Sequence, residues 1–319
     1  MFPVIRRNFG VLALGASSVL VLAGCGESAV SESDTSSGAK GGDTLVMAAV
    51  PAENSTDLKA SYATVIKMLE KETGQKIEFQ KATNYAAVIE GQRSGKIQIA
   101  AYGPFSYVQA KSSGVKATPI AAGVEKKGDK PGYRSYGIVK TGSPIKDLKG
   151  FAGKKVCFVD PNSTSGYLYP RSGLLAAGVD VEKGITAVMS GGHDASVLAV
   201  KSGQCEAGFA YDTMVDKQLI EKGQLKKDEI TTVWKSDLIP GSPVAISDDL
   251  DADLKQKITN AFRTMANVDY LKAHGYCGGS AKCEVDDAGD WGYATVDDAT
   301  YDGVRKVCEV TKDKQCVES

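Results

Sequence analysis

Short apolar runs alternate with amphipathic segments along the chain from residue 44 onward. Apolar runs of about four to eight residues are typical of buried strands, whereas apolar residues three and four positions apart are typical of helices. On this basis strands are predicted at 44–50, 77–79 and 97–101, and helices at 58–72 and 85–93. Strand and helix follow one another in turn, so this part of the chain is predicted to form a parallel sheet with helices on its faces.

The same alternation returns after Tyr136. Strands are predicted at 135–139, 155–159, 185–188, 207–211, 231–234 and 244–246, and helices up to 177 and at 195–201 and 250–267. We therefore predict an α/β fold of two lobes, the first formed by residues 44–137 plus 236–275 and the second by residues 138–235. The chain crosses between them near 136–140 and again near 234–236, and two such crossings make a hinge.

The first 25 residues have the pattern of an export signal. Arg6 and Arg7 precede an apolar run at 11–23, and small residues stand directly before Cys25. This pattern resembles a bacterial lipoprotein signal, which implies removal of residues 1–24 and a lipid on the Cys25 thiol. A transmembrane helix fits less well because the run is shorter than the ~20 apolar residues that cross a bilayer. The expected location is therefore extracytoplasmic, anchored by lipid to the outer face of the bacterial cell membrane.

Residues 25–43 are rich in Ser, Gly and Asp and contain no aromatic residue. Such a segment buries too little apolar surface to fold, so we interpret it as a flexible tether. The remaining residues suffice for two lobes with separate cores.

Seven cysteines leave six once Cys25 is assigned to the lipid, and an even number suits disulfides in an oxidising compartment. Six cysteines allow 15 pairings. The pairs predicted from sequence proximity and strand position are Cys157–Cys205, Cys277–Cys283 and Cys308–Cys316. A metal site is disfavoured because paired Cys-x-x-Cys spacing is absent and only His193 and His274 could be added.

The formal charge of the 319-residue chain is −1, and the sequence has no basic stripe. This argues against nucleic acid as a partner. An anion would have to be bound by local dipoles, and residues 160–167 (DPNSTSGY) offer them. Hydroxyl residues between a strand and a helix lie beside unpaired helix N–H groups, where anions bind, although an ordinary N-cap cluster has the same composition. The helix begins either near Pro170 or at Thr164 with a kink.

Other polar residues follow predicted strands, at the edge where α/β sheets bind ligands. The candidates for ligand contact are Tyr85, Tyr102, Ser163, Thr164, Ser165, His193 and Asp212. Each also has a structural interpretation. The tyrosines could cover core edges, His193 could begin a helix, and Asp212 could cap one or pair with Lys217.

Several motifs, in the same order, resemble those of phosphonate-binding proteins of ABC importers. They run from about residue 44 to 273: YAAVIEG at 85–91, IAAYGP at 99–104, PGY at 131–133, DPNSTSG at 160–166, GGHD at 191–194 and WKSDLIPG at 234–241. The resemblance implies a type II periplasmic-binding fold that binds a phosphorus oxyanion and delivers it to a permease and an ATPase.

The resemblance also implies roles for the candidates. Ser163, Thr164 and Ser165 would bind the oxyanion, His193 would donate to it, and Tyr85 and Tyr102 would close over it. Such a protein needs no cofactor, and a monomer is expected.

The sequence departs from relatives that bind aminoalkylphosphonates. Those proteins place acids around the ammonium group, whereas Thr213 and Ser242 stand at the corresponding positions here. A buried ammonium without a counter-charge is costly, so we predict phosphate, phosphite or a simple alkylphosphonate. Asp212, one position away from the family's acid, leaves room for an amine or for a protonated ligand oxygen. Residues 276–319 fall outside the resemblance and are predicted to be a disulfide-stapled extension.

Two other functions use the same residues. A hydrolase could use Ser165, His193 and Asp212 as nucleophile, base and orienting acid, but the sequence has no Gly-x-Ser-x-Gly elbow. The same binding fold could also signal to a membrane receptor, and the sequence does not separate that function from transport.

Overall fold

The computed structural model describes residues 44–52, 58–278 and 283–316. The predicted signal peptide, the lipid attachment site Cys25 and the tether at 25–43 lie outside these residues.

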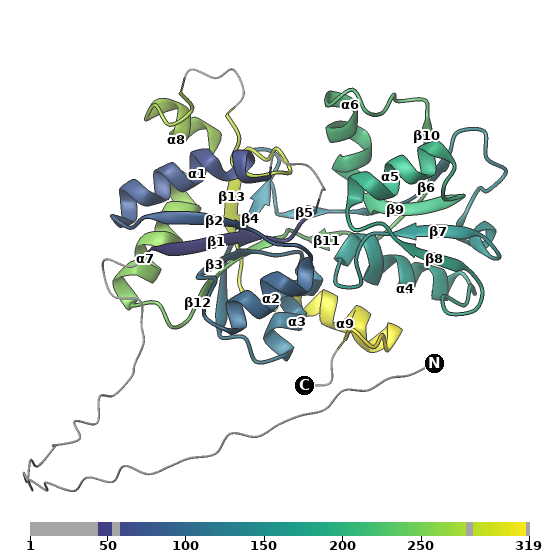
Figure 1. Ribbon diagram of the computed structural model, residues 1–319, viewed down its shortest axis with the longest axis horizontal. Helices are drawn as coiled ribbons and strands as arrows, with labels where there is room; N and C mark the ends of the chain where they lie inside the picture. Colours follow the sequence, from purple (N-terminus) through teal and green to yellow (C-terminus); the bar gives the residue numbers. More distant parts are fainter. Residues whose placement is uncertain (1–43, 53–57, 279–282, 317–319) are drawn as a thin grey trace, which may run out of the picture. The chain divides into compact units, whose positions relative to one another are not determined.

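Strands from both ends of the described chain form a six-stranded sheet, which defines lobe one (Figure 1). Its order is β13 (Gly292–Thr295), β4 (Ala117–Val124), β12 (Pro243–Ser247), β3 (Ile99–Ala101), β1 (Leu45–Ala49) and β2 (Ile77–Lys81). The neighbours β2 and β3 run parallel to β1, while β12 and β13 run antiparallel to their partners. The predicted parallel core of this lobe is therefore correct, with antiparallel strands added on one side.

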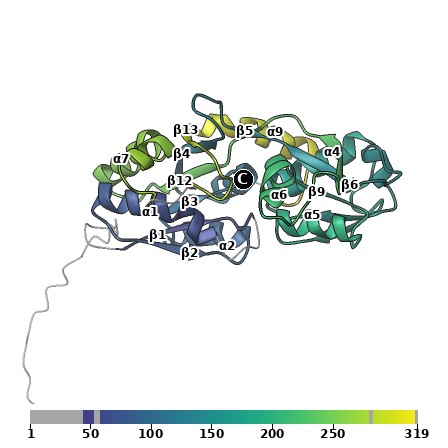
Figure 2. The same ribbon diagram turned by 90° about the horizontal axis from the view of Figure 1, so that it is seen from above.

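Helices cover both faces of this sheet (Figure 2). The core of one face contains residues of α1 (Leu58–Thr73), α7 (Ala252–Asn260), the π-helical η4 (Ala261–Met265) and α8 (Val268–Ala273). The core of the other face contains residues of α2 (Tyr85–Arg93) and α3 (Pro104–Ser112). Side chains on one stripe of each helix pack against the sheet, which is why helical apolar spacing was a reliable guide here.

A five-stranded sheet defines lobe two. Its order is β10 (Ile230–Lys235), β6 (Ser135–Lys140), β9 (Ala207–Tyr211), β7 (Lys155–Phe158) and β8 (Thr186–Met189). Its helices are the 3₁₀ turn η1 (Leu148–Phe151), the π-helical η2 (Thr164–Leu168) and η3 (Met214–Gln218), α4 (Tyr169–Ala176), α5 (His193–Ser202) and α6 (Leu219–Glu221). The five strands and the helices α4 and α5 follow the predicted pattern, whereas η1, η3 and α6 were not predicted.

The two segments that link the lobes pair with each other. Strand β5 (Gly132–Tyr133) lies antiparallel to β11 (Ile239–Pro240) just outside the two sheets. Tyr133 precedes β6 and Ile239 follows β10, so both linking segments are held side by side.

Strand β4 was not predicted, although it lies between β12 and β13. Pro119 and Gly123 interrupt its apolar run and give it the composition of a loop. The structure accommodates Pro119 at a register shift opposite Val244 and Ala245. A bulge of this kind removes the need for the N–H group that proline lacks.

The segment 276–319 was predicted to be an extension apart from the lobes, and this is corrected by the structure. Strand β13 pairs with β4 and completes the sheet of lobe one. The 3₁₀ turn η5 (Asp298–Tyr301) and helix α9 (Asp302–Thr311) follow. The structure contains the three predicted disulfides, Cys157–Cys205, Cys277–Cys283 and Cys308–Cys316.

Candidate functional site

The turn after β7 begins as a π-helix and continues as an α-helix. Ser163 caps it, with its Oγ accepting from the Gly166 N–H at 3.1 Å. A Cβ at Gly166 would lie 2.3 Å from a Val159 methyl group, so the tight turn requires glycine there. Helix α4 then starts at Tyr169 with Pro170 in its first turn. Both sequence alternatives therefore hold in part: the turn begins at Thr164, and the α-helix begins beside Pro170.

Thr164 links this turn to lobe one. Its Oγ1 accepts a hydrogen bond of 2.8 Å from the backbone N–H of Phe105, in the first turn of α3. The N-cap residue of α3 is Gly103, which has no side chain to accept from that turn. A hydroxyl of lobe two therefore caps a helix of lobe one.

Ser165 is fixed through its backbone, because its carbonyl oxygen accepts from the Ser135 hydroxyl at 2.6 Å. The hydroxyl-bearing residues Ser163, Thr164 and Ser165 are each no more than 2% exposed. The turn is therefore both buried and anchored before any ligand is considered.

His193 stands at the start of α5 beside the turn. Its Nδ1 accepts from the Tyr211 N–H at 3.2 Å, and its Nε2 lies 3.3 Å from Ser163 Oγ. An Nδ1 that accepts a hydrogen bond carries no proton, so in the neutral ring the proton is on Nε2. Burial lowers the pKa of His193 to about 3. At neutral pH the ring is thus an uncharged donor directed toward Ser163.

Two tyrosines of lobe one and the hinge complete this wall. Tyr85, at the start of α2, is 2% exposed, and its hydroxyl interacts with Ser163. The Tyr133 hydroxyl, from β5, interacts with the hydroxyls of Thr164, Ser165 and Ser242. Burial raises the pKa of both tyrosines, so both stay protonated and able to donate. Tyr133 lies in a motif noted in the sequence, but it was not predicted as a site residue because a two-residue strand gives no local signal.

These residues line one cavity of ≈ 350 Å³. Six of the seven predicted ligand residues contribute to its wall: Tyr85, Tyr102, Ser163, Thr164, Ser165 and His193. We call the part formed by Tyr85, Tyr133, Ser163–Ser165 and His193 the hydroxyl wall. None of its side chains carries a formal charge at neutral pH.

Tyr102 and Asp212 differ from the other predictions. The Tyr102 hydroxyl reaches the Val88 carbonyl oxygen at 3.5 Å, so it points toward α2 although the residue lines the cavity. Asp212 is not among the lining residues. Its carboxylate accepts from the backbone N–H groups of Arg134 and Thr213, both at 2.9 Å, and its neighbour Thr213 lines the cavity instead.

Another part of the cavity lining is acidic. Its acids come from the segment after β4 and from the loop before β13, with Tyr62 of α1 and Tyr293 of β13 beside them, and none of these residues was predicted. We call them the carboxyl wall: Glu125, Asp286, Asp287, Asp290, Tyr62 and Tyr293. Tyr62 donates to Asp287 at 3.0 Å. Glu125 lies far in sequence from Asp286, Asp287 and Asp290, and neither segment has a recognised motif, so only the fold brings these acids to one cavity.

Burial dominates the protonation of this wall. It raises the pKa of Asp286 strongly, and the nearby Asp290 charge raises it further. Burial also raises the pKa of Asp290, to about 6. Two carboxyl groups this close do not both ionise easily, so Asp286 holds its proton more tightly and Asp290 is the first of the two to ionise. Gly123 permits the contact, because a Cβ there would lie 1.9 Å from Asp290 Oδ2.

The geometry does not assemble the hydrolase triad considered from sequence. The serine next to His193 Nε2 is Ser163 rather than Ser165. The group on Nδ1 is the Tyr211 backbone N–H, which is a donor, whereas a triad requires an acceptor acid there. Asp212 bonds to backbone groups of Arg134 and Thr213. The arrangement supplies hydrogen-bond donors rather than an activated nucleophile.

Within 44–52, 58–278 and 283–316, no helix combines the length and apolar character needed to cross a bilayer. Over the same ranges, no group of three or more His, Cys, Asp or Glu side chains is arranged to hold a metal ion.

Comparison with known families decides what kind of protein carries this cavity. Residues 47–301 match the family model described as ABC transporter, phosphonate, periplasmic substrate-binding protein. The chain belongs to this family. Its members are solute-binding proteins of transporters, so the chain is an extracytoplasmic substrate-binding component of an ABC transporter and not an enzyme. The match extends past residue 273, where the sequence resemblance was taken to end, and includes β13.

Relatives and structures agree with the family assignment. The chain is 46% identical over 320 residues to a phosphate-import protein, PhnD, of Mycolicibacterium smegmatis, covering 98% of this chain and 99% of the relative. It is 31% identical over 231 residues to the phosphonates-binding periplasmic protein of Escherichia coli, covering 70% and 67%. The structure of PhnD1 from Prochlorococcus marinus in complex with methylphosphonate has a TM-score of 0.71 at 20% identity, covering 84% and 98%. This likeness confirms the type II periplasmic-binding fold.

Proposed function

We propose that this family member binds a phosphorus oxyanion at the hydroxyl wall and delivers it to its permease and ATPase. The observation that carries the proposal is the convergence of five buried uncharged groups, Tyr85, Ser163, Thr164, Ser165 and His193, on one cavity. Donors of this kind bind a tetrahedral oxyanion without the desolvation cost of a buried cation.

Contacts across the lobes support a clamp-like binding mode. The Thr164 hydroxyl accepts from lobe one, and the backbone N–H of His193 donates to the Ala52 carbonyl oxygen, after β1, at 2.8 Å. We infer that the lobes separate to admit the anion and close over it, with Tyr85 and Tyr102 arriving from lobe one. The bound ligand then stabilises the closed state only through contacts that the open state lacks.

The ligand we favour is phosphate, phosphite or a simple alkylphosphonate. The M. smegmatis relative at 46% identity is named a phosphate-import protein, and the P. marinus structure holds methylphosphonate. The acids are also occupied by the protein itself, since Asp287 accepts from Tyr62 and Asp286 shares its proton with Asp290. These engagements leave less capacity for a ligand ammonium group.

An aminoalkylphosphonate is the second candidate, and the carboxyl wall is the observation that favours it. The prediction against an amine depended on Thr213 and Ser242 standing where relatives have acids. Asp286, Asp287 and Asp290 line the same cavity from a different segment. Asp287 and Asp290 supply negative charge that Thr213 and Ser242 do not.

A thermal-shift screen tests both candidates. The arms are phosphate, phosphite, methylphosphonate and 2-aminoethylphosphonate, with sulfate at equal concentration as the control for general ionic effects. A ligand at 100 times its Kd stabilises the folded state by about 2.7 kcal/mol, which raises the Tm by about 5 °C or more. A shift with an amine-free phosphorus oxyanion and none with sulfate is expected. No shift with any of the four would contradict the proposal, and a shift with 2-aminoethylphosphonate alone would select the second candidate.

The anchored location completes the proposal. We infer that the mature chain is attached through a lipid on Cys25 and reaches its permease by way of the tether at 25–43. The sensor alternative uses the same binding site, so neighbouring genes for a permease and an ATPase would favour transport.

A further inference from the structure

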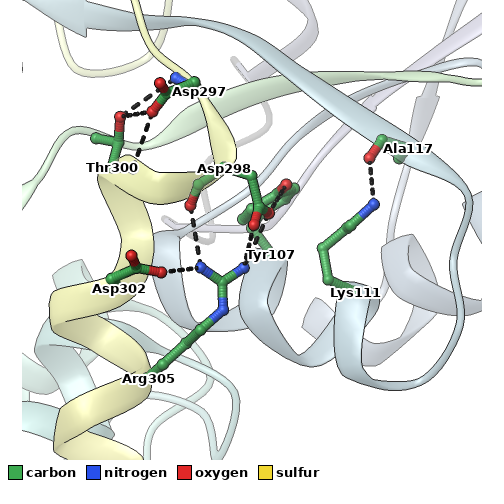
Figure 3. A network of polar contacts seen from close by, with 8 residues as sticks. All are labelled: Tyr107, Lys111, Ala117, Asp297, Asp298, Thr300, Asp302 and Arg305. Atoms are coloured by element: carbon green, nitrogen blue, oxygen red, sulfur yellow. Dashed lines mark hydrogen bonds and ion pairs between the residues drawn. The ribbon is translucent and has the colours of Figure 1, made fainter.

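The end of the described chain attaches first to lobe one. Asp298 accepts from the Tyr107 hydroxyl of α3 at 2.6 Å and from both terminal nitrogens of the Arg305 guanidinium, through its carboxylate and its backbone carbonyl (Figure 3). The Tyr301 ring packs against Tyr107 at 4.9 Å between centroids, and its hydroxyl donates to the Gly241 carbonyl oxygen at 3.1 Å. Residues 298–305 are therefore fixed to α3 and to the hinge.

The same segment then reaches lobe two. Asp313 has a side chain with no exposed area, and its Oδ2 accepts from the Tyr167 hydroxyl at 3.1 Å. The Arg171 guanidinium of α4 forms an ion pair with the same oxygen. The Cys308–Cys316 disulfide closes the loop that presents Asp313. We call residues 298–316 the C-terminal clasp, because they contact both lobes.

Apolar packing follows the same path. Tyr301 and Val304 belong to a hydrophobic cluster that contains α3 residues of lobe one, such as Phe105, and α4 residues of lobe two, such as Leu174. The disulfide half-cystines Cys308 and Cys316 pack against this cluster. The clasp thus joins the lobes through buried surface as well as through polar contacts.

The lobe-two end of the clasp contacts residues 163–168, which we call the anion-binding turn. Tyr167 belongs to the same five-residue π-helix as Thr164 and Ser165. On the other side of the turn, the Gln109 amide of α3 donates to Asn162 Oδ1 and to the Gln315 carbonyl oxygen of the clasp, both at 2.9 Å. Hydrogen bonds therefore hold the turn on both sides, through Gln109 at Asn162 and through Asp313 at Tyr167.

We propose that the C-terminal clasp positions the anion-binding turn through Asp313 and thereby sets the affinity of the site. The inference concerns the site of the proposed function and depends on it for the identity of the anion. The π-helix needs outside support, because its hydrogen-bond geometry is rarer and less stable than that of an α-helix. Asp313 gives that support to Tyr167 and Arg171 together. It lies in the part of the clasp that follows residue 301, where the family match ends.

The experiment compares the full chain with Asp313→Asn and Tyr167→Phe. Asp313→Asn weakens the contacts of Asp313 with both Tyr167 and Arg171. Tyr167→Phe removes only the tyrosine hydroxyl and keeps the buried ion pair, so it tests the proposal even if Asp313→Asn folds poorly. The matched control is Glu182→Gln, which removes the exposed partner of the same Arg171 and leaves Asp313 in place. Hydrogen exchange of the 163–168 amides is followed without ligand, and phosphate and methylphosphonate binding is measured by calorimetry.

Faster exchange of the 163–168 amides is expected in both clasp variants and not in Glu182→Gln. The same two variants should bind the anion between about twofold and tenfold more weakly, the range for one net hydrogen bond. Unchanged exchange and unchanged affinity in Asp313→Asn and Tyr167→Phe would overturn the clasp proposal. If the wild-type chain binds neither anion, that absence of binding would contradict the proposed function. Faster exchange in the two clasp variants would then still support the positioning of the turn.

Discussion

The two walls of the cavity differ in origin and in chemistry. The hydroxyl wall consists of uncharged donors from short local motifs, and the carboxyl wall consists of acids supplied mainly by the loop before β13. Ser163 and His193 are each held by backbone groups close to them, Gly166 and Tyr211. Asp286 and Asp290 instead interact with each other, and the pKa of both carboxyl groups is raised. The hydroxyl wall offers donors to a negatively charged ligand. In the carboxyl wall, the raised pKa of its buried acids reduces the negative charge of the wall itself.

This difference separates two ways of specifying a ligand. Neutral donors bind an oxyanion whatever the rest of the molecule contains. An acidic wall discriminates among oxyanions by their other groups. It repels further negative charge and accepts hydrogen bonds from protonated oxygens or amines. Variants that remove one wall at a time can test this division.

The largest effect is expected from Ser163→Ala combined with Thr164→Ala. Loss of both hydroxyls removes two donors to the anion, so phosphate binding should fall by a factor of about 100 or more. Both hydroxyls also cap helices, since Ser163 Oγ accepts from Gly166 and Thr164 Oγ1 accepts from Phe105. The empty variant should therefore lose about 1–3 kcal/mol of unfolding free energy, measured by denaturant titration.

The control for this double variant is Thr164→Ser, which keeps a hydroxyl at the position that caps α3. It should bind phosphate within a few-fold of the wild type and retain most of the stability. Tight binding by the double alanine variant, measured by calorimetry, would exclude the hydroxyl wall as the anion site.

The hydroxyl wall was largely predictable from the sequence because its residues follow strands. Ser163, Thr164, Ser165 and His193 stand at strand ends that a parallel sheet brings to one edge. Asp212 stands at such an end too, yet its carboxylate accepts from the Arg134 backbone N–H and its neighbour Thr213 lines the cavity. Strand-end position predicts the neighbourhood of a residue and not the direction of its side chain.

The carboxyl wall could not be predicted because its position depends on a strand hidden by composition. Strand β4 contains Pro119 and Gly123, so its pattern does not stand out from a loop. Without β4 there is no partner for β13, and without β13 nothing brings Asp286 and Asp290 to the cavity. The prediction therefore lacked Asp286 and Asp290 at the cavity for the same reason that it lacked β4. Two of the disulfides could be predicted because Cys277–Cys283 and Cys308–Cys316 are close in sequence, and the third because Cys157 and Cys205 each stand at the start of a predicted strand in one lobe.

A smaller effect, of opposite sign, is expected from Asp290→Asn. The pKa of Asp290 is raised to about 6 in the folded protein, chiefly by burial, against about 3.9 in an unfolded chain. The folded state binds this proton more tightly, so its contribution to stability is complete below pH 4 and is lost as pH rises through 6. At pH 8 the variant should be more stable than the wild type by about 1–3 kcal/mol.

The advantage of Asp290→Asn should shrink between pH 6 and pH 4, which urea titrations at several pH values can follow. Asp249→Asn, at an exposed site, is the matched control and should show no such trend. A constant difference between Asp290→Asn and wild type at all pH values would contradict the burial of charge at this wall.

The smallest effect is expected from Tyr133→Phe, which probes the junction between the hinge and the hydroxyl wall. The Tyr133 hydroxyl interacts with those of Thr164, Ser165 and Ser242, and burial raises its pKa, so it remains a donor at every pH of interest. Loss of this one group should weaken phosphate binding about fivefold, the equivalent of one ordinary hydrogen bond. Tyr276→Phe is the matched control, because among the described residues the buried Tyr276 hydroxyl has no hydrogen-bond partner and Tyr276 does not line the cavity. Equal affinities for Tyr133→Phe and Tyr276→Phe in calorimetry would show that the hinge tyrosine packs beside the anion site without ordering its hydroxyls.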